Sequence, residues 1–281
     1  MRQGFLKQSW VFWLKVLCTS VVLLLLGDVA SDAQAKIHRN HEQASLQPQK
    51  DVILSRLVIP LPQAWGETVR GVRTHFVPEG KELALTLDAC GSARDGYDKK
   101  LIDYLVKHRI PATLFINQRW IRKNARTFTH LSKNALFSIQ NHGTHHKPCA
   151  VSRRSIYGIE STANASECYD EIQANAETIE RLTHKRPMFY RSGTAYYDTT
   201  GVTIAQALRH EVLGFSILGD RGASYTKKEV YQALLQSQSG DIIIAHMNHP
   251  ESDTAEGLLK AIPALQKRGF RFVLLEGKPL K

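Results

Sequence analysis

From residue 83 to residue 275, short apolar runs alternate with amphipathic stretches, and this alternation constrains the fold more than any other feature of the sequence. The apolar runs have the length and composition of buried strands, and they lie at 83–87, 112–116, 135–139, 188–190, 212–218, 241–245 and 270–275. The stretches between them have helical periodicity, and they lie at 97–108, 118–133, 167–183, 202–208, 227–236 and 254–267. Strands and helices that alternate in this way predict βα units around a parallel sheet.

Seven predicted strands within about 190 residues suit a closed or nearly closed sheet, so we predict a distorted (β/α)7–8 barrel. An open doubly wound sheet is the alternative. Gly91 and Gly193 each stand alone, and no glycine-rich phosphate loop opens any predicted helix. This pattern disfavours a nucleotide-binding sheet.

The first 35 residues have the three-part layout of a secretory signal. Arg2, Lys7 and Lys15 give a basic start, residues 16–26 form an apolar run, and Ala33-Gln34-Ala35 matches the small-x-small cleavage pattern. We therefore predict a signal peptide at 1–35 and an exported protein, periplasmic or secreted. An uncleaved membrane anchor is the alternative, and the short apolar run disfavours it.

The remaining chain divides into a lead-in at 36–80 and the barrel domain at 81–281. The lead-in begins with a polar stretch and then contains three apolar segments, at 52–54, 57–59 and 74–77. These segments predict peripheral strands added to the main fold.

The chain carries a formal charge of +11, and about +10 remains after residues 1–35 are removed. Such an excess is compatible with an anionic partner such as a wall polymer or a lipid surface. No block of Lys and Arg with interleaved aromatic residues is present, so we predict no nucleic-acid partner. The membrane is expected to be contacted only through the signal or an uncleaved anchor.

Three cysteines remain after Cys18 leaves with the signal, which predicts one disulfide and one free thiol in an oxidising compartment. A Cys149–Cys168 bond is favoured because it closes a short segment. A Cys90–Cys149 bond is the competing possibility.

Polar and ionisable residues follow five of the predicted strands. The carboxyl ends of parallel strands are where α/β folds build their sites. The residues in question are Asp88, Asn141 with His142, Arg191, Asp220 and His246. Each one alone is compatible with a solvated loop, but together they predict a single site.

The segment that begins at Asn141 also places three histidines within five positions: His142, His145 and His146. Neutral imidazole is the commonest protein ligand for transition metals. Residues 142 and 146 can reach one ion if the backbone makes a helical turn. A divalent ion held there lowers the pKa of bound water and polarises a carbonyl. With Asp88 as base and His246 as acid, oriented by Arg191 and Asp220, this set predicts hydrolysis of an amide or ester.

The segment from 83 to 275 resembles the polysaccharide deacetylases with NodB homology, the family 4 carbohydrate esterases. Five short motifs in order carry the resemblance, and they cover about two-thirds of the chain. They are Leu85-Thr86-Leu87-Asp88-Ala89-Cys90-Gly91, Asn141 to Pro148, Phe189-Tyr190-Arg191-Ser192-Gly193, Asp220, and Gly240 to His246.

The resemblance implies a distorted barrel, a zinc ion or a similar divalent metal, and removal of acetyl groups from an N-acetylated polysaccharide. It implies that His142 and His146 are metal ligands, with His145 a neighbour. His246 is then the general acid, Arg191 holds the catalytic aspartate, and Asp220 tunes His246.

The first motif departs from the family pattern, in which two aspartates are adjacent, one as base and one as metal ligand. Here Asp88 is followed by Ala89, and the Met247-Asn248 pair after His246 is similar to a single-aspartate branch of the family. Three outcomes are open: Asp88 serves the metal, water fills the ligand position while Asp88 stays the base, or activity is lost. Asp95, Asp98 and Cys90 are further candidates for the position, but none stands where the motif needs it.

Two functions follow from these observations. The first is an exported metal-dependent deacetylase acting on peptidoglycan or another acetylglucosamine polymer. The second is a catalytically weak relative that binds polysaccharide. The histidines, Arg191 and His246 favour the first, and the missing second aspartate favours the second.

Overall fold

The computed structural model describes residues 50–57, 62 and 64–281, and the chain divides into two units, 1–56 and 57–281. Of the first unit, residues 50–56 are described, and they are helical. The strand predicted at Val52–Leu54 is therefore wrong, since a short apolar run does not by itself distinguish a strand from a helix. The predicted signal peptide at 1–35 lies outside the described residues.

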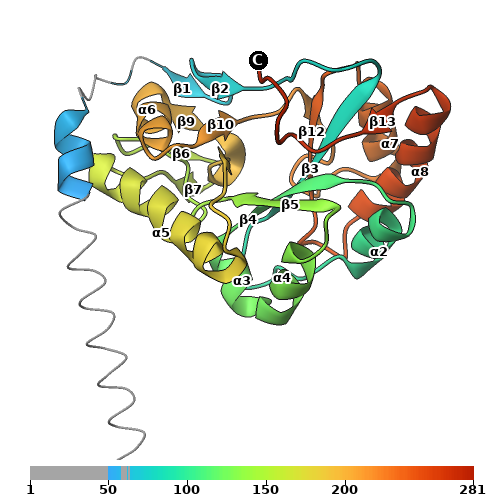
Figure 1. Ribbon diagram of the computed structural model, residues 1–281, viewed down its shortest axis with the longest axis horizontal. Helices are drawn as coiled ribbons and strands as arrows, with labels where there is room; N and C mark the ends of the chain where they lie inside the picture. Colours follow the sequence, from blue (N-terminus) through green and yellow to red (C-terminus); the bar gives the residue numbers. More distant parts are fainter. Residues whose placement is uncertain (1–49, 58–61, 63) are drawn as a thin grey trace, which may run out of the picture. The chain divides into compact units, whose positions relative to one another are not determined.

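The second unit is built on a sheet that has nine strands among the described residues, all of them parallel (Figure 1). Along the sheet the order is β11 (Ile217–Leu218), β12 (Ile242–His246), β3 (Glu82–Ala89), β4 (Ala112–Ile116), β5 (Phe137–Asn141), β8 (Phe189–Tyr190), β10 (Glu211–Leu213) and β2 (Val72–Arg73), and β13 (Arg271–Phe272) pairs with β3.

The connection between β10 and β11 shows that the sheet is curled. These strands lie six places apart in the order, which would separate them by about 29 Å in a flat sheet. Only residues 214–216 join them, and the chain from Leu213 to Ile217 reaches at most about 14 Å. The predicted distorted barrel is confirmed, and the open sheet is wrong. The one strand predicted at 212–218 is two strands: β11 at one edge of the sheet and β10, which lies next to β2 near the other edge.

The lead-in helps to fill the gap between the two edges. After β2 pairs with β10, the chain continues to Phe76, whose backbone N–H donates to Gly240 O at 2.9 Å, just before β12. His75 forms an isolated bridge with Asp241. Residues 72–76 therefore extend from β10 towards β12. At 74–77, where a peripheral strand is predicted, the chain forms isolated bridges at His75 and Phe76, and the strand β2 lies just before them.

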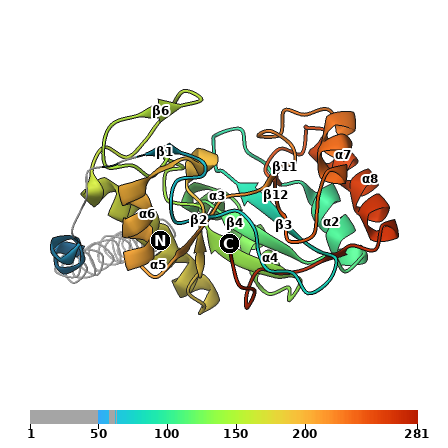
Figure 2. The ribbon, with the colours of Figure 1, turned by 90° about the horizontal axis from the view of Figure 1, so that it is seen from above.

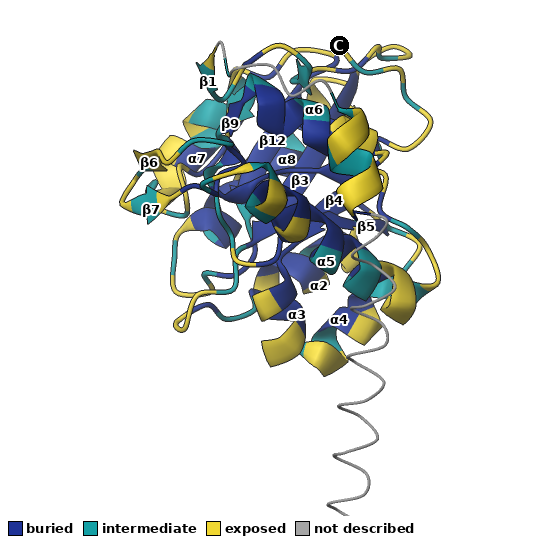
Figure 3. Cartoon of the chain, turned by 90° about the vertical axis from the view of Figure 1, so that its left-hand side faces the viewer, coloured by how far each residue is buried: buried dark blue, intermediate teal, exposed yellow. Residues whose placement is uncertain are grey.

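Helices pack on the outside of the sheet (Figure 2). Their bounds are α2 (Lys99–Lys107), α3 (Gln118–Lys123), α4 (Ala125–Ser132), α5 (Ala165–Thr183), α6 (Thr199–Ala207), α7 (Lys227–Leu235) and α8 (Thr254–Lys267). Figure 3 shows that β3, β4 and β5 are buried, whereas several helices have one buried and one exposed face. Side chains cap most of the helix N-termini, as the sequence favours: Asp98, Asn117, Asn164, Asp198 and Thr226.

Within residues 50–57 and 64–281, we find no helix with both the length and the hydrophobicity needed to cross a bilayer.

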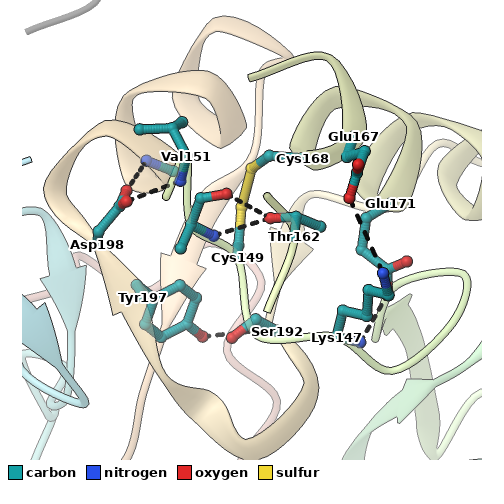
Figure 4. Close-up of a disulfide and its surroundings, with 12 residues drawn as sticks. Lys147, Cys149, Val151, Thr162, Glu167, Cys168, Glu171, Ser192, Tyr197 and Asp198 are labelled. Atoms are coloured by element: carbon teal, nitrogen blue, oxygen red, sulfur yellow. Dashed lines mark hydrogen bonds and ion pairs between the residues drawn. A yellow bond between two sulfur atoms is a disulfide. The ribbon is translucent and has the colours of Figure 1, made fainter. Parts of the chain in front are cut away.

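The disulfide joins Cys149 to Cys168, as predicted, and Cys90 is free (Figure 4). It fastens the chain that follows the histidine segment to the first turn of α5. The segment between the two cysteines forms a hairpin of β6 (Ser155–Ile156) and β7 (Ile159–Glu160). Its two ends are also joined by Thr162, whose hydroxyl bonds to the N–H and C=O of Ala150.

Short elements next to β8 complete the second unit. A 3-10 turn, Gly193–Ala195, follows β8, and then β9 (Tyr197–Asp198) pairs antiparallel with β1 (Trp65–Gly66). Asp198 accepts from the backbone N–H of Val151 at 2.8 Å (Figure 4), so β9 also supports the base of the hairpin.

His210, directly before β10, provides a test of how the interior packs around Tyr190 of β8. Its ring is buried beside the Tyr190 ring, and burial, reinforced by the charge of Arg186, lowers its pKa to about 3. Between pH 6.5 and 3 the unfolded chain therefore binds a proton that the folded protein does not, so stability falls as pH falls. The loss from this group is about 1.4 kcal/mol per pH unit, or about 2 kcal/mol between pH 6.5 and 5.

Urea unfolding from pH 7 to pH 5 measures this slope. We expect His210→Gln to reduce the slope by an amount that grows below pH 6.5 and approaches about 1.4 kcal/mol per pH unit near pH 5, and His130→Gln, at an exposed position, to leave it unchanged. Equal slopes in the wild type and His210→Gln would contradict a neutral buried imidazole.

Candidate active site and metal centre

The alternation of side chains along β3 positions the first part of the site. Leu83, Leu85, Leu87 and Ala89 pack into the hydrophobic core beneath the helices. Successive side chains of a strand point to opposite faces, so Thr86 and Asp88 share the other face, which lines the inside of the curled sheet. Ala89, at the place where the family has its second aspartate, is fully buried in the apolar core.

Arg191, directly after β8, reaches across the inside of the sheet to Asp88. Its Nη1 donates to Asp88 Oδ1 at 2.7 Å and to Thr86 Oγ1 at 2.9 Å, and its Nη2 donates to Gly214 O at 2.8 Å. The guanidinium is fully buried and lies over the Phe115 ring, 4.2 Å from the centroid. Burial alone would raise the pKa of Asp88, but Arg191 and the nearby histidines hold it below its ordinary value.

His142 follows β5 and turns its Nε2 towards Asp88. Its Nδ1 lies 2.8 Å from the carbonyl oxygen of Arg191, which can only accept, so Nδ1 carries the proton and Nε2 carries a lone pair. Nε2 is 3.6 Å from Asp88 Oδ2, the oxygen that Arg191 Nη1 does not bind. Burial lowers and Asp88 raises the pKa of His142, and the net shift is upward.

His146 lies beside His142, with ring centroids 4.9 Å apart. The expected helical turn is not what brings them together, because residues 142–148 contain no helix and both Gly143 and His146 have positive φ, 75° and 61°. Gly193 permits the arrangement, since a Cβ there would lie 2.1 Å from His146 O. The two rings converge through a loop with left-handed residues.

Glu171 of α5 holds this loop, and the sequence analysis missed it. Its buried carboxylate accepts from the backbone N–H groups of His145 and Lys147 at about 3 Å. A Cβ at position 143 would lie 2.4 Å from Glu171 Oε1, which explains Gly143. The available signal was a carboxylate on the helix face shared by Cys168, Ile172 and Asn175, where burial is expected.

Cys90 lies beside the two histidines. Its Sγ lies 3.7 Å from His142 Nε2, and the donor atoms of Cys90, His142 and His146 all lie within 4.8 Å of one another. Burial would raise the pKa of the Cys90 thiol, but the neighbouring histidines, His146 first among them, bring it well below its ordinary value. This cysteine was only a minor candidate for the ligand position in the sequence analysis.

His246 ends β12 and is in register with Asp88 on the adjacent strand β3. Its Nδ1 is 2.8 Å from Asp220 Oδ1, and its backbone N–H donates to Asp220 Oδ2 at 2.8 Å. Thr254 also donates to Asp220, which is fully buried. Burial lowers the pKa of His246, but Asp220 outweighs it and brings that pKa well above its ordinary value.

The structure thus brings together all six predicted site residues: Asp88, His142, His146, Arg191, Asp220 and His246. His145 is exposed and lines a separate hollow with Glu167 and Asp170, which agrees with its exclusion from the ligand set. Asp95 accepts from Ser92 N at 2.6 Å, and Asp98 caps α2. Neither carboxylate belongs to the group of close donor atoms that Cys90, His142 and His146 form among the described residues.

These residues fit a divalent metal ion. His142 offers a lone pair on Nε2 while its other nitrogen bonds a carbonyl, which is the usual support of a metal-bound histidine. His146 and Cys90 provide further donor atoms of types that zinc and cobalt accept. Asp88 lies close enough to serve either as base or as ligand, so its role remains a prediction.

Residues 77–213 match the polysaccharide deacetylase family. Over 205 residues the chain is 24% identical to the peptidoglycan-N-acetylmuramic acid deacetylase PdaA of Bacillus subtilis, covering 70% of this chain and 72% of PdaA.

Solved structures share the fold. One is a CE4 family pseudoenzyme from Bacillus anthracis, with a TM-score of 0.58 and 22% identity over 71% of this chain. The chain spans 65% of that protein. Another is a family 4 acetyl xylan esterase from Clostridium thermocellum in complex with a cobalt ion, with a TM-score of 0.57 and 23% identity, covering 69% of this chain and 88% of the other.

Proposed function

Because this chain belongs to the polysaccharide deacetylases of the NodB-homology type, we propose that it is an exported, metal-dependent enzyme that hydrolyses acetamide groups of an N-acetylated polysaccharide. The observation that carries the proposal is that Asp88, His142 and His246 lie close together at one end of the sheet. Asp88 lies 3.6 Å from the metal-facing nitrogen of His142 and in register with His246.

His142, His146 and one further donor would hold the ion. A divalent ion in this position supplies a Lewis acid for the acetyl carbonyl and lowers the pKa of a bound water. The Arg191 carbonyl bonded to His142, and Glu171 bonded to the backbone of the loop, hold the donor atoms in place.

Asp88 and His246 divide the proton transfers between them. Asp88, kept ionised by Arg191, takes a proton from the attacking water through Oδ2, which faces His142. His246, kept protonated by Asp220, donates a proton to the leaving amine. Arg191 and Asp220 position these two groups and set their charge.

Peptidoglycan or another acetylglucosamine polymer is the proposed substrate. The B. subtilis relative is a peptidoglycan deacetylase, which supports this class of polymer. Export is supported by the signal pattern at 1–35 and by the Cys149–Cys168 disulfide, which suits an oxidising compartment such as the periplasm or the cell exterior.

Acetate release tests the function directly. We expect the full chain with zinc, cobalt or manganese to release acetate from acetylglucosamine oligomers or peptidoglycan and to stop after chelation. Asp88→Asn should lower the rate by about 10²–10⁴-fold, because the base is lost. Asp103→Asn, at an exposed carboxylate on α2, should leave it unchanged.

One observation favours a second candidate, a polysaccharide-binding relative without catalysis: Ala89 occupies the place of the family's second aspartate. No acetate with any metal, together with retained binding to the same glycans, would support that candidate and refute the enzyme.

A further inference from the structure

Cys90 lies near the place where the family's second aspartate would bind the metal ion. Cys90 directly follows β3, and its Sγ lies 3.7 Å from His142 Nε2, the nitrogen that Asp88 Oδ2 also approaches, whereas Ala89 packs in the core. Gly91 then turns the chain, with φ of 82°, and a Cβ there would lie 2.6 Å from Trp120 N. Only glycine allows this close approach, which fixes the end of β3 and, with it, Cys90.

The distances suit a shared metal ion. Zinc bonds sulfur at about 2.3 Å and histidine nitrogen at about 2.0–2.1 Å, so in a tetrahedral site these donors lie about 3.6 Å apart. Cys90 Sγ and His142 Nε2 are 3.7 Å apart. His146 contributes the third donor within the same 4.8 Å group.

A disulfide with either of the other described cysteines is not available to this thiol. Cys149 and Cys168 are bonded to each other, so neither can pair with Cys90. Of the two other carboxylates near Cys90 in sequence, Asp95 accepts from Ser92 N and lies 3.7 Å from His249 Nε2, and Asp98 accepts from Leu101 N through Oδ1.

We propose that Cys90 Sγ is the third protein ligand of the ion, which gives a Cys-His-His site in place of the family's Asp-His-His site. The inference rests on the metal centre of the proposed function. Thiolate is a soft ligand, whereas manganese and magnesium prefer oxygen. The site therefore selects zinc or cobalt over manganese more strongly than a site with aspartate does.

Cobalt binding gives a readout that does not depend on activity. We expect the full chain loaded with Co²⁺ to show a thiolate-to-cobalt charge-transfer band in the near ultraviolet. Cys90→Ser should lose the band and bind zinc at least about tenfold more weakly, since even changes to residues that only hydrogen-bond a metal ligand cost about 10–100-fold in affinity. Cys90→Asp should bind without the band and with a smaller preference for zinc over manganese. Cys18→Ser, the matched control, should keep the band.

Alkylation provides a second measurement. In Cys18→Ser the disulfide leaves Cys90 as the one free thiol, and we expect zinc to slow its reaction with iodoacetamide, as followed by mass. No band in the cobalt protein, or an undiminished band in Cys90→Ser, would overturn the proposal. If His142→Ala nevertheless abolished cobalt binding, the metal centre of the proposed function would stand without Cys90. If cobalt bound to none of these proteins, the metal dependence would fail as well.

Discussion

Arg191→Met is expected to abolish acetate release and to lower the free energy of unfolding by about 3–5 kcal/mol. Arg191 is fully buried, and its Nη1 forms an ion pair with Asp88, which is itself 2% exposed. Removing the guanidinium leaves an ionised carboxylate in the interior without its counter-charge. It also leaves the carbonyl of Gly214 without this donor. Breaking a buried pair from one side is among the most destabilising single changes.

Urea unfolding at pH 7 measures the loss of stability. The matched control is Arg126→Met, at an exposed position on α4, which we expect to stay within about 0.5 kcal/mol of the wild type. The double variant Arg191→Met/Asp88→Leu should recover part of the stability but no activity, because both charges are then gone. Wild-type stability in Arg191→Met would contradict the ion pair as described.

His246→Gln is expected to lower kcat on an acetylated polysaccharide by about 10²–10⁴-fold while the metal content stays the same. An amine is a poor leaving group without a proton, and His246 is the residue that Asp220 keeps protonated. An activated aryl acetate releases a stable phenolate that needs no proton. The loss on that ester should therefore be much smaller than the loss on the amide.

Asp220→Asn separates orientation from proton donation. It preserves the shape of the side chain but removes the charge that holds His246, so we expect a loss on the amide between those of the wild type and His246→Gln. Metal content by atomic absorption serves as the control for both variants. An equal loss on ester and amide substrates would show that His246 does not act as the acid.

The strands that carry the site could be predicted from sequence because each is a continuous apolar run. β4 was predicted with its observed bounds, Ala112–Ile116, and β3 and β12 to within one or two residues at each end. The run at 212–218 could not be resolved in this way. Residues 214–216 leave the sheet there, where Gly214 packs against Val72 and its carbonyl accepts from Arg191. Both partners are distant in sequence, so no local pattern reports them.

In the candidate site, too, some residues could be predicted from local sequence and others depend on contacts with distant parts of the chain. Asp88, Arg191 and His246 could be predicted because each stands at the carboxyl end of a predicted strand, and parallel strands bring these ends together. The family pattern puts the ligand position at Ala89, next to Asp88 in sequence, whereas the structure brings Cys90, the residue after the end of β3, to His142. Glu171 was missed because its partners are backbone N–H groups of a loop that the sequence alone does not place.

We expect the hairpin between the two disulfide cysteines to accept changes without disturbing the loop at residues 142–148. Its base is closed by the Cys149–Cys168 bond, by Thr162 on Ala150, and by Asp198 on Val151, whereas Tyr157 at its tip is 71% exposed. Loops of this kind tolerate insertion and replacement. Apart from the contact of Tyr157 with the Tyr196 ring, we therefore expect the hairpin tip to accept changes of length and sequence while the base of the hairpin and the loop at 142–148 keep their conformation.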